Sequence, residues 1–436
     1  MHSTTRRPSR GIRTALLGGI AAASLALTGC QGSALGGGGD EAEEAAPGIT
    51  DTEIHIGVTY PFSGALSAYG AQYKGAQAYV DYVNDEFGGV KSADGKTRKI
   101  ILDTADDQYD PAKAFEQVRK LVENDGVFAI AGVVGTPSNS AIIDYLNESD
   151  VPHVFAATGA SKWGATPDVY PWSIGFQPAY SLESAAYVQY LEENQPDAKV
   201  ALLYQNDDYG KDFLVGFKAA VEQSDTDIEI VAEESYETSD TTLDSQMARL
   251  AASGATAANL ITTPKFAAQA LQFLYDSSWD PQTVVVASPA ASISSTILPI
   301  GVEKAQGIIT ALYFKDPADP QWDDDEGMKQ YKEILSTYSD VEDLSENMPV
   351  HGFNHFYAVV EALKGMKEPT RQGLMDAVLS MDKVEHPMLV PGSTVNTGAD
   401  DRFPVETLML QQFEGEHWKI ISEALHFEGQ TASLSK

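Results

Sequence analysis

The chain has 436 residues, with 63 acidic and 29 basic side chains and a formal net charge of −34 at pH 7. An excess of negative charge this large argues against binding to nucleic acid or to anionic lipid, because both select for Lys and Arg. The acidic residues are spread along the chain, which favours a role in solubility. The length exceeds that of one small domain and suits two lobes.

The N-terminal residues predict export. Four arginines precede an apolar run from about Ala15 to Leu27, which is shorter than the roughly 20 residues of a membrane-spanning helix. Residues 1–29 are therefore predicted to be a signal peptide. A twin-arginine export route has only weak support, because no apolar residue follows Arg6 and Arg7 directly.

The apolar run ends in Leu-Thr-Gly before Cys30, a pattern that resembles the lipobox of bacterial lipoproteins. Cys30 is the only cysteine of the chain, so it has no internal disulfide partner, and lipidation would account for it. A chance cysteine after an ordinary cleavage site is the alternative. Residues 30–50 form a glycine-rich, acidic tether that cannot bury a core. We expect an extracytoplasmic protein that is attached to the cell membrane only by a lipid at Cys30.

From about Asp51, apolar runs rich in β-branched residues alternate with helical periods. A helix follows the first strand, because apolar residues from Tyr73 to Phe87 are spaced three and four apart. Asp110 and Pro111 predict the N-cap and first turn of another helix. The predicted strands of this part are residues 53–60, 99–104, 127–134 and 151–157.

The same alternation resumes after Pro171, with strands predicted at residues 199–204, 228–232, 258–262 and 283–287. The predicted helices between them are residues 211–221, 243–252 and 266–275. Two such runs predict two α/β lobes, each with a doubly wound parallel sheet covered on both faces. Helices at residues 355–363 and 371–379, and a hairpin at 406–422, predict that each lobe is completed by chain returning from the other.

Motifs of catalysis and metal binding are weak. The sequence has no G-x-S-x-G, no P-loop and no G-x-G-x-x-G that opens a helix after a strand, so we expect no enzyme and no cofactor. The acidic run at residues 323–327 resembles a calcium loop, but Trp322 stands where the first ligand should be. His351 and His355 have the spacing of a zinc pair, yet no third ligand is evident. A structural or pocket role is the favoured interpretation, and no metal is expected.

Small, hydroxyl-rich loops follow the predicted strands in both halves of the chain. Open α/β sheets bind ligands at the carboxyl ends of their strands, and helix starts attract anions such as carboxylates. The alternative is that Gly, Ser and Thr serve there only as turn and cap residues. The loops are residues 61–64 with 69–70, then 135–138, 158–161, 206–210 and 262–264.

Four segments resemble the leucine/isoleucine/valine-binding protein family, the type I periplasmic solute-binding proteins of ABC transporters: GVTYPFSGALSAYG, DDQYDPAKAFEQVRKLVENDGVFAIAG, VPHVFAATGASKWG and LLYQNDDYGKDF. The resemblance runs from about residue 52 to 425. It implies a type I periplasmic binding protein fold, in which two doubly wound lobes are joined by three crossovers and close around a ligand. The crossovers would lie near residues 173–176, 312–315 and 391–395.

The resemblance implies a monomer that hands its ligand to an ABC transporter permease. Residues 51–174 plus 314–392 would form the N-terminal lobe, and residues 175–313 plus 393–436 the C-terminal lobe. Thr136 would hydrogen-bond the ligand carboxylate, helped by the backbone of Ala160 and Ser161 and by the Ser161 hydroxyl. Tyr69 would form an aromatic wall of the pocket.

From the second lobe, Tyr209 and Thr263 would face the ligand, and His351 would lie near a pocket-lining position. Ser288, or a neighbour, stands where amino-acid binders of this family carry a Glu that grips the α-ammonium. A neutral group cannot offer a charge-assisted bond to an ammonium. Asp207 or Asp208 could replace that Glu by turning inward, and N-capping is the alternative.

We therefore expect the substrate-binding lipoprotein of an ABC importer of the branched-chain amino acid type. Its solute would be a small carboxylate or an amino-acid-like molecule, captured by closure of the lobes. The alternative is a ligand-sensing receptor-type domain that passes occupancy to a signalling partner. The absence of a later apolar run or output domain in this sequence argues against that alternative.

Overall fold

The computed structural model describes residues 46–434. The predicted signal peptide and Cys30 lie outside these residues. The described part belongs to one compact unit that contains two sheets. Among these residues, no helix combines the length and apolar character needed to cross a bilayer.

The first sheet has six strands in the order β2-β3-β1-β4-β5-β6. Its central strand, β1, pairs in parallel with β3 and with β4. The bounds of β1 are those predicted, whereas β4 is shorter than residues 127–134, because Gly132 turns the chain with φ of +62°. The strands are β1 (Glu53–Tyr60), β2 (Val90–Lys91), β3 (Thr97–Asp106), β4 (Ala129–Ala131), β5 (His153–Ala156) and β6 (Ser173–Gly175).

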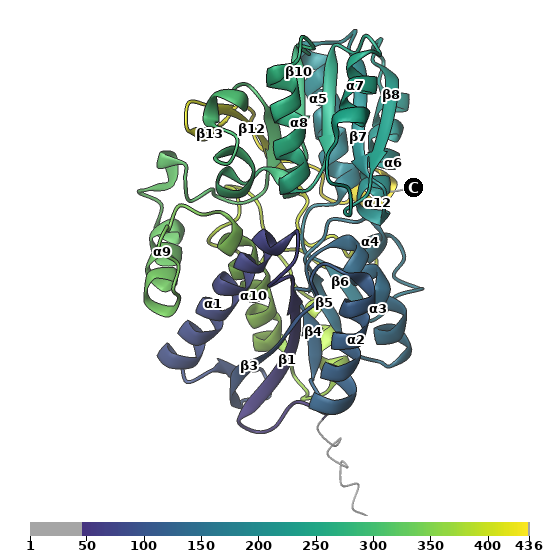
Figure 1. Cartoon of the computed structure of the whole chain (residues 1–436). Helices are drawn as coiled ribbons and strands as arrows, with labels where there is room; N and C mark the ends of the chain where they lie inside the picture. The colour runs from purple at the N-terminus through teal and green to yellow at the C-terminus, as the bar shows by residue number, and fades with distance from the viewer. Residues whose placement is uncertain (1–45, 435–436) are drawn as a thin grey trace, which may run out of the picture. The chain divides into compact units, whose positions relative to one another are not determined.

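Helices from two distant parts of the chain cover this sheet (Figure 1). The early ones are α1 (Gln72–Glu86), α2 (Pro111–Lys120), α3 (Thr136–Glu148) and the single turn α4 (Lys162–Ala165). Asp110 caps α2 as predicted, since its side chain accepts from the backbone N–H groups of Ala112 and Lys113. The late ones are α10 (Met348–Gly365) and α11 (Arg371–Val378), with α9 (Glu326–Tyr338) beside α1.

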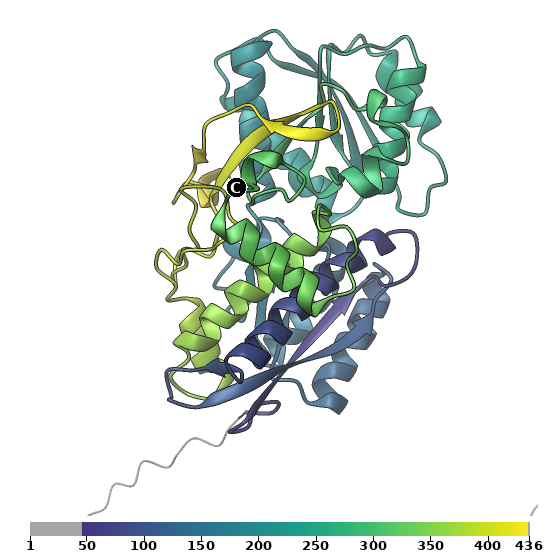
Figure 2. The ribbon, with the colours of Figure 1, turned by 90° about the vertical axis from the view of Figure 1, so that its left-hand side faces the viewer.

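The second sheet has eight strands in the order β13-β12-β11-β10-β9-β7-β8, with β14 paired to β12. The predicted hairpin is confirmed, because β12 and β13 pair antiparallel around Gly415 and lie at the edge of this sheet (Figure 2). The strands are β7 (Lys199–Gln205), β8 (Glu229–Tyr236), β9 (Ala257–Ile261), β10 (Thr283–Val286), β11 (Ile309–Leu312), β12 (Thr407–Glu414), β13 (His417–Ile420) and β14 (Leu425–His426).

The helices of the second lobe are α5 (Tyr180–Asn194), α6 (Asp208–Gln223), α7 (Asp244–Ala251), α8 (Pro264–Asp276) and α12 (Thr431–Leu434). Periodicity does not reveal α5, because it is buried on several sides and has no clear polar face. The calcium-like acidic run starts α9, where Asp325 caps the helix and pairs with Lys315.

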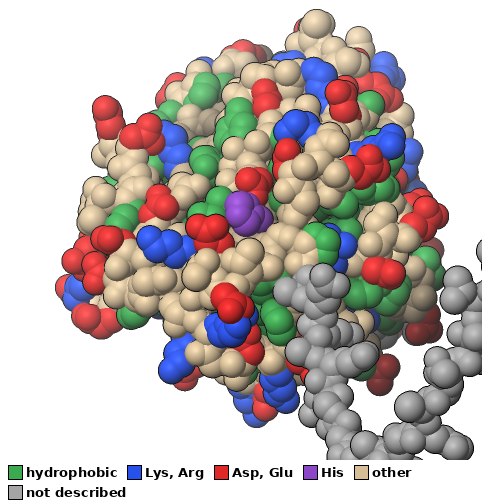
Figure 3. All heavy atoms as spheres, turned by 90° about the horizontal axis from the view of Figure 1, so that it is seen from below, with side chains coloured by type: hydrophobic (Ala, Val, Ile, Leu, Met, Phe, Trp, Pro, Cys, Tyr) green, Lys and Arg blue, Asp and Glu red, His purple; other side chains and the backbone are tan. Residues whose placement is uncertain are grey.

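The chain passes between the two sheets three times, after β6, after β11 and before β12. This confirms the predicted fold class, two doubly wound lobes joined by three crossovers. On the face shown in Figure 3, Asp and Glu side chains are interspersed with Lys and Arg.

Two glycines let α1 and α10 approach at backbone distance. A Cβ at Gly75 would lie 1.8 Å from the carbonyl oxygen of Pro349, and one at Gly352 would lie 1.8 Å from that of Gln72. The two helices therefore cross where neither has a side chain, and any larger residue would force them apart.

We expect Gly352→Ala to lower the free energy of unfolding by about 1–3 kcal/mol, the usual cost of overpacking. Gly365→Ala, on the same helix, is the control, because its Cβ would meet no atom closer than 3.6 Å and alanine is the better helix former. Urea denaturation of both variants measures the difference. Equal stability of the two would contradict a steric role for Gly352.

Candidate functional site

A small cavity lies between the two lobes, at the carboxyl ends of strands from both sheets. Its volume of about 30 Å³ is room for about two water molecules, so a larger solute requires the lobes to move apart. Four of the predicted site residues line it: Tyr69, Tyr209, Thr263 and His351. The remaining lining residues are Gln72, Tyr109, Val134, Gly135, Ala157, Gln177, Tyr180 and Pro289.

Four tyrosines dominate the wall of this cavity. Tyr69 stacks on Tyr109, with ring centroids 6.0 Å apart, and the rings of Tyr180 and Tyr209 meet edge to face, with centroids 5.3 Å apart. The Tyr69 hydroxyl donates to the backbone carbonyl of Pro289 at 2.9 Å, which is a direct link between the lobes. Sequence reasoning missed Tyr109, although it lies in one of the segments that carry the family resemblance.

The lining residues carry no formal charge at neutral pH. None of them is Asp, Glu, Lys or Arg, and burial lowers the pKa of His351 to about 4. The Nδ1 atom of His351 lies 3.0 Å from the Tyr313 hydroxyl. Burial raises the pKa of Tyr180 to about 12, so its hydroxyl stays protonated and polar without charge.

His355, one helical turn after His351, packs against Phe176 with ring centroids 4.9 Å apart. Burial lowers its pKa to about 3, which makes it a neutral core residue. Among the described residues, neither histidine belongs to a group of three or more side chains with metal-binding spacing.

The other four predicted residues do not line the cavity, although they lie in the loops around it. The Thr136 hydroxyl lies 2.6 Å from the Thr158 hydroxyl, and the backbone N–H of Ala160 donates to the same Thr158 oxygen at 3.1 Å. The Thr158 hydroxyl is in turn 3.5 Å from that of Tyr180, so these groups support the cavity wall.

Ser161 is bonded to an acid from the opposite lobe. Its backbone N–H and its hydroxyl both donate to one carboxylate oxygen of Asp212, each at 3.1 Å. The helix that Ser161 opens, α4, is only one turn long, so this loop lacks the dipole of a full helix.

Ser288 is hydrogen-bonded to a second acid, Glu183, which the sequence did not reveal. The carboxylate of Glu183, on α5, accepts from the Ser288 backbone N–H at 2.8 Å, from its hydroxyl at 2.7 Å and from the Tyr187 hydroxyl. Burial raises the pKa of Glu183. No sequence signal identifies this acid, because α5 itself has no recognisable period.

The two aspartates considered as ammonium partners have other contacts. Asp207 is the N-cap of α6 and accepts from the backbone N–H groups of Tyr209 and Gly210. Asp208 bonds to Lys162 and to Ser140, each at 2.8 Å, across the lobes.

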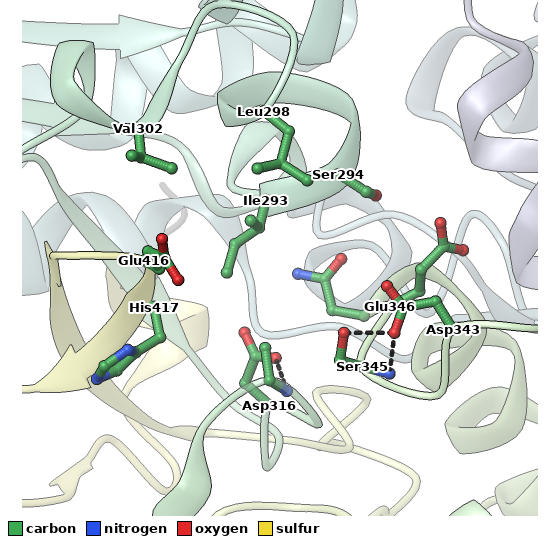
Figure 4. Close-up of a pocket in the computed structure, with 12 residues that line it drawn as sticks. Ile293, Ser294, Leu298, Val302, Asp316, Asp343, Ser345, Glu346, Glu416 and His417 are labelled. Atoms are coloured by element: carbon green, nitrogen blue, oxygen red, sulfur yellow. Dashed lines mark hydrogen bonds between the residues drawn. The ribbon is translucent and has the colours of Figure 1, made fainter.

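A larger cavity, of about 410 Å³, takes lining residues from both lobes (Figure 4). It is acidic, since Asp316, Asp343, Glu346 and Glu416 line it and no Lys or Arg does. Asp343 accepts from the hydroxyl and backbone N–H of Ser345. None of the predicted site residues lines this cavity, so the tyrosine-lined cavity at the strand ends is the candidate site.

Comparisons with known proteins identify a family for this chain. The family described as periplasmic binding protein matches residues 53–417. The chain is 30% identical over 177 residues to "Leu/Ile/Val-binding protein homolog 3" of Brucella melitensis biotype 1, a match that spans 39% of this chain and 44% of that relative. The chain therefore covers less than half the length of this curated relative.

Two solved structures share the fold over nearly their whole length. A branched-chain amino acid ABC transporter protein of Thermus thermophilus, with bound valine, has a TM-score of 0.77 at 16% identity over 88% of this chain and 99% of that one. A fatty acid ABC transporter substrate-binding protein of Thermomonospora curvata has a TM-score of 0.74 at 23% identity over 89% of this chain and 96% of that one.

The contacts of Ser288 predict a structural role. Ser288→Ala removes one hydrogen bond from a buried carboxylate, so we expect the free energy of unfolding to fall by about 1.5–3 kcal/mol. Ser295→Ala is the control, because the Ser295 hydroxyl has no partner among the described residues. Urea denaturation decides the matter: unchanged stability of Ser288→Ala, with weakened solute binding, would instead place Ser288 against the solute.

Proposed function

Because the chain belongs to the periplasmic binding protein family, we propose that it is the extracytoplasmic solute-binding component of an ABC importer. It would act as a monomer that hands its solute to a permease. The observation that carries the proposal is the cavity at the strand ends, which takes lining residues from both lobes. A solute held there would favour the closed arrangement by its differential contacts with the two lobes.

The charge of the lining supports one class of solute. A free α-ammonium buried in this cavity would lack a carboxylate among the lining residues, and an unpaired buried charge costs several kcal/mol. Glu183, behind Ser288, already accepts three hydrogen bonds. We propose a small amide or carboxylate without a free α-ammonium, held by the amides of Gln72 and Gln177 and by the hydroxyls of Tyr109 and Tyr180.

Similar proteins are described both with a solute that has an α-ammonium and with one that lacks it. One is described with bound valine, which has an α-ammonium, and the other is described as a fatty acid transporter protein. The uncharged lining of this chain favours a solute without an α-ammonium. Tyr69 and Tyr209 suit a planar or an aliphatic group equally.

Leucine and valine are therefore expected to stabilise the protein little, and 4-methylvalerate or isovalerate, or their amides, to stabilise it more. A thermal-shift panel that pairs each amino acid with its deaminated acid and amide measures this. Strong stabilisation by leucine or valine with none from the paired compounds would show that an ammonium partner exists. Native mass spectrometry of gently purified protein would then identify the solute carried over.

Cys30 is proposed to carry the lipid anchor. Cys30→Ala should abolish labelling by a radioactive fatty acid and should release the protein from the membrane fraction once its signal sequence is removed. One acyl chain binds a membrane only marginally, so multiple acylation is expected in the unaltered protein. Continued membrane fractionation of the processed variant would contradict the anchor.

A further inference from the structure

Two carboxylates lie one turn apart on α6 and face the first lobe. Asp208 and Asp212 are four positions apart in the sequence, which places them on the same face of the helix. Asp208 contacts a cation, because its carboxylate lies 2.8 Å from the Lys162 ammonium. Asp212 forms no ion pair among the described residues, and its partner is Ser161.

Asp212 takes up both hydrogen-bond donors of Ser161. One carboxylate oxygen of Asp212 accepts hydrogen bonds from both the backbone N–H and the hydroxyl of Ser161, each at 3.1 Å. Hydrogen bonds to an ionised acceptor are stronger than those between neutral groups. Burial raises the pKa of Asp212 to about 6, because the ionised carboxylate loses contact with water. The two hydrogen bonds from Ser161 partly offset this cost. Ser161 itself is almost wholly buried, and its exposed fraction is 6%.

Resting on the proposed function, we propose that Asp212 is an internal ligand of the first lobe and thereby a specificity-determining residue. When the lobes close, its carboxylate occupies the Ser161 donors, so a solute closes the protein without placing a carboxylate of its own there. A second carboxylate at these donors would be repelled by the first. Of the two solute classes proposed above, the neutral amide is therefore favoured over the acid.

The first experiment uses no solute. Hydrogen exchange of the segment containing Ser161, followed by mass spectrometry, reports on the N–H group that Asp212 binds. Asp212→Ala should raise its exchange rate about tenfold or more, as expected from the loss of a hydrogen bond to a charged group. Acetate should restore protection in this variant because it replaces the missing carboxylate, whereas acetamide should restore less.

Three further variants keep this test decisive. Glu222→Gln, an exposed acid at the far end of α6, should leave the exchange unchanged. Asp212→Ala combined with Ser161→Ala should need more acetate for the rescue, because only the backbone N–H donor remains. Asp212→Asn keeps the size of the side chain and one acceptor, so it decides the matter if the alanine variant folds poorly. Unchanged exchange in Asp212→Asn and Asp212→Ala, or no rescue by acetate, would overturn the proposal.

The second experiment measures selectivity with isovaleramide and isovalerate in thermal-shift titrations. The unaltered protein should bind the amide more tightly than the acid. In Asp212→Asn the ratio of the two affinities should shift toward the acid by about tenfold. Equal preference in both proteins would overturn the specificity role. If neither compound stabilises either protein, the proposed solute class fails, and hydrogen exchange alone then decides whether Asp212 occupies the Ser161 donors.

Discussion

The backbone contact between α1 and α10 is the constraint on which the candidate site depends. Gly75 and Gly352 leave no side chain at the crossing, so the two helices meet carbonyl to Cα. Tyr69 lies just before α1 and His351 in the first turn of α10, and both line the cavity. Two wall residues from distant parts of the chain are thus held in one place by a contact that has no adjustable side chain.

Several polar groups in the loops around the cavity are bonded to one another. Thr136 and Ala160 bond to Thr158, Ser288 bonds to Glu183, and Ser161 bonds to Asp212. These bonds fix the loops at the strand ends, because a buried polar group left without a partner would be costly. They also leave the cavity with aromatic and amide side chains and without charge, and this lining determines which solutes we propose.

Local patterns in the sequence predicted much of the fold. β1 has the predicted bounds and Asp110 caps α2, because these features depend on neighbouring residues alone. Four predicted site residues also line the cavity. The acids Glu183 and Asp212 could not be anticipated, since each meets its serine across a large distance in sequence, 105 and 51 residues. A buried carboxylate of this kind is recognised only when tertiary structure shows its donors.

The three passages of the chain between the lobes have a mechanical consequence. Two bodies joined by a single strand of chain can rotate about every axis, whereas three connections restrict the rotations that remain. The opening and closing proposed for the lobes would then follow a restricted path. A partner that contacts both lobes would then have few arrangements to distinguish, the solute-free one and the solute-bound one. The number of connections, as well as the solute, would therefore affect how well that partner distinguishes them.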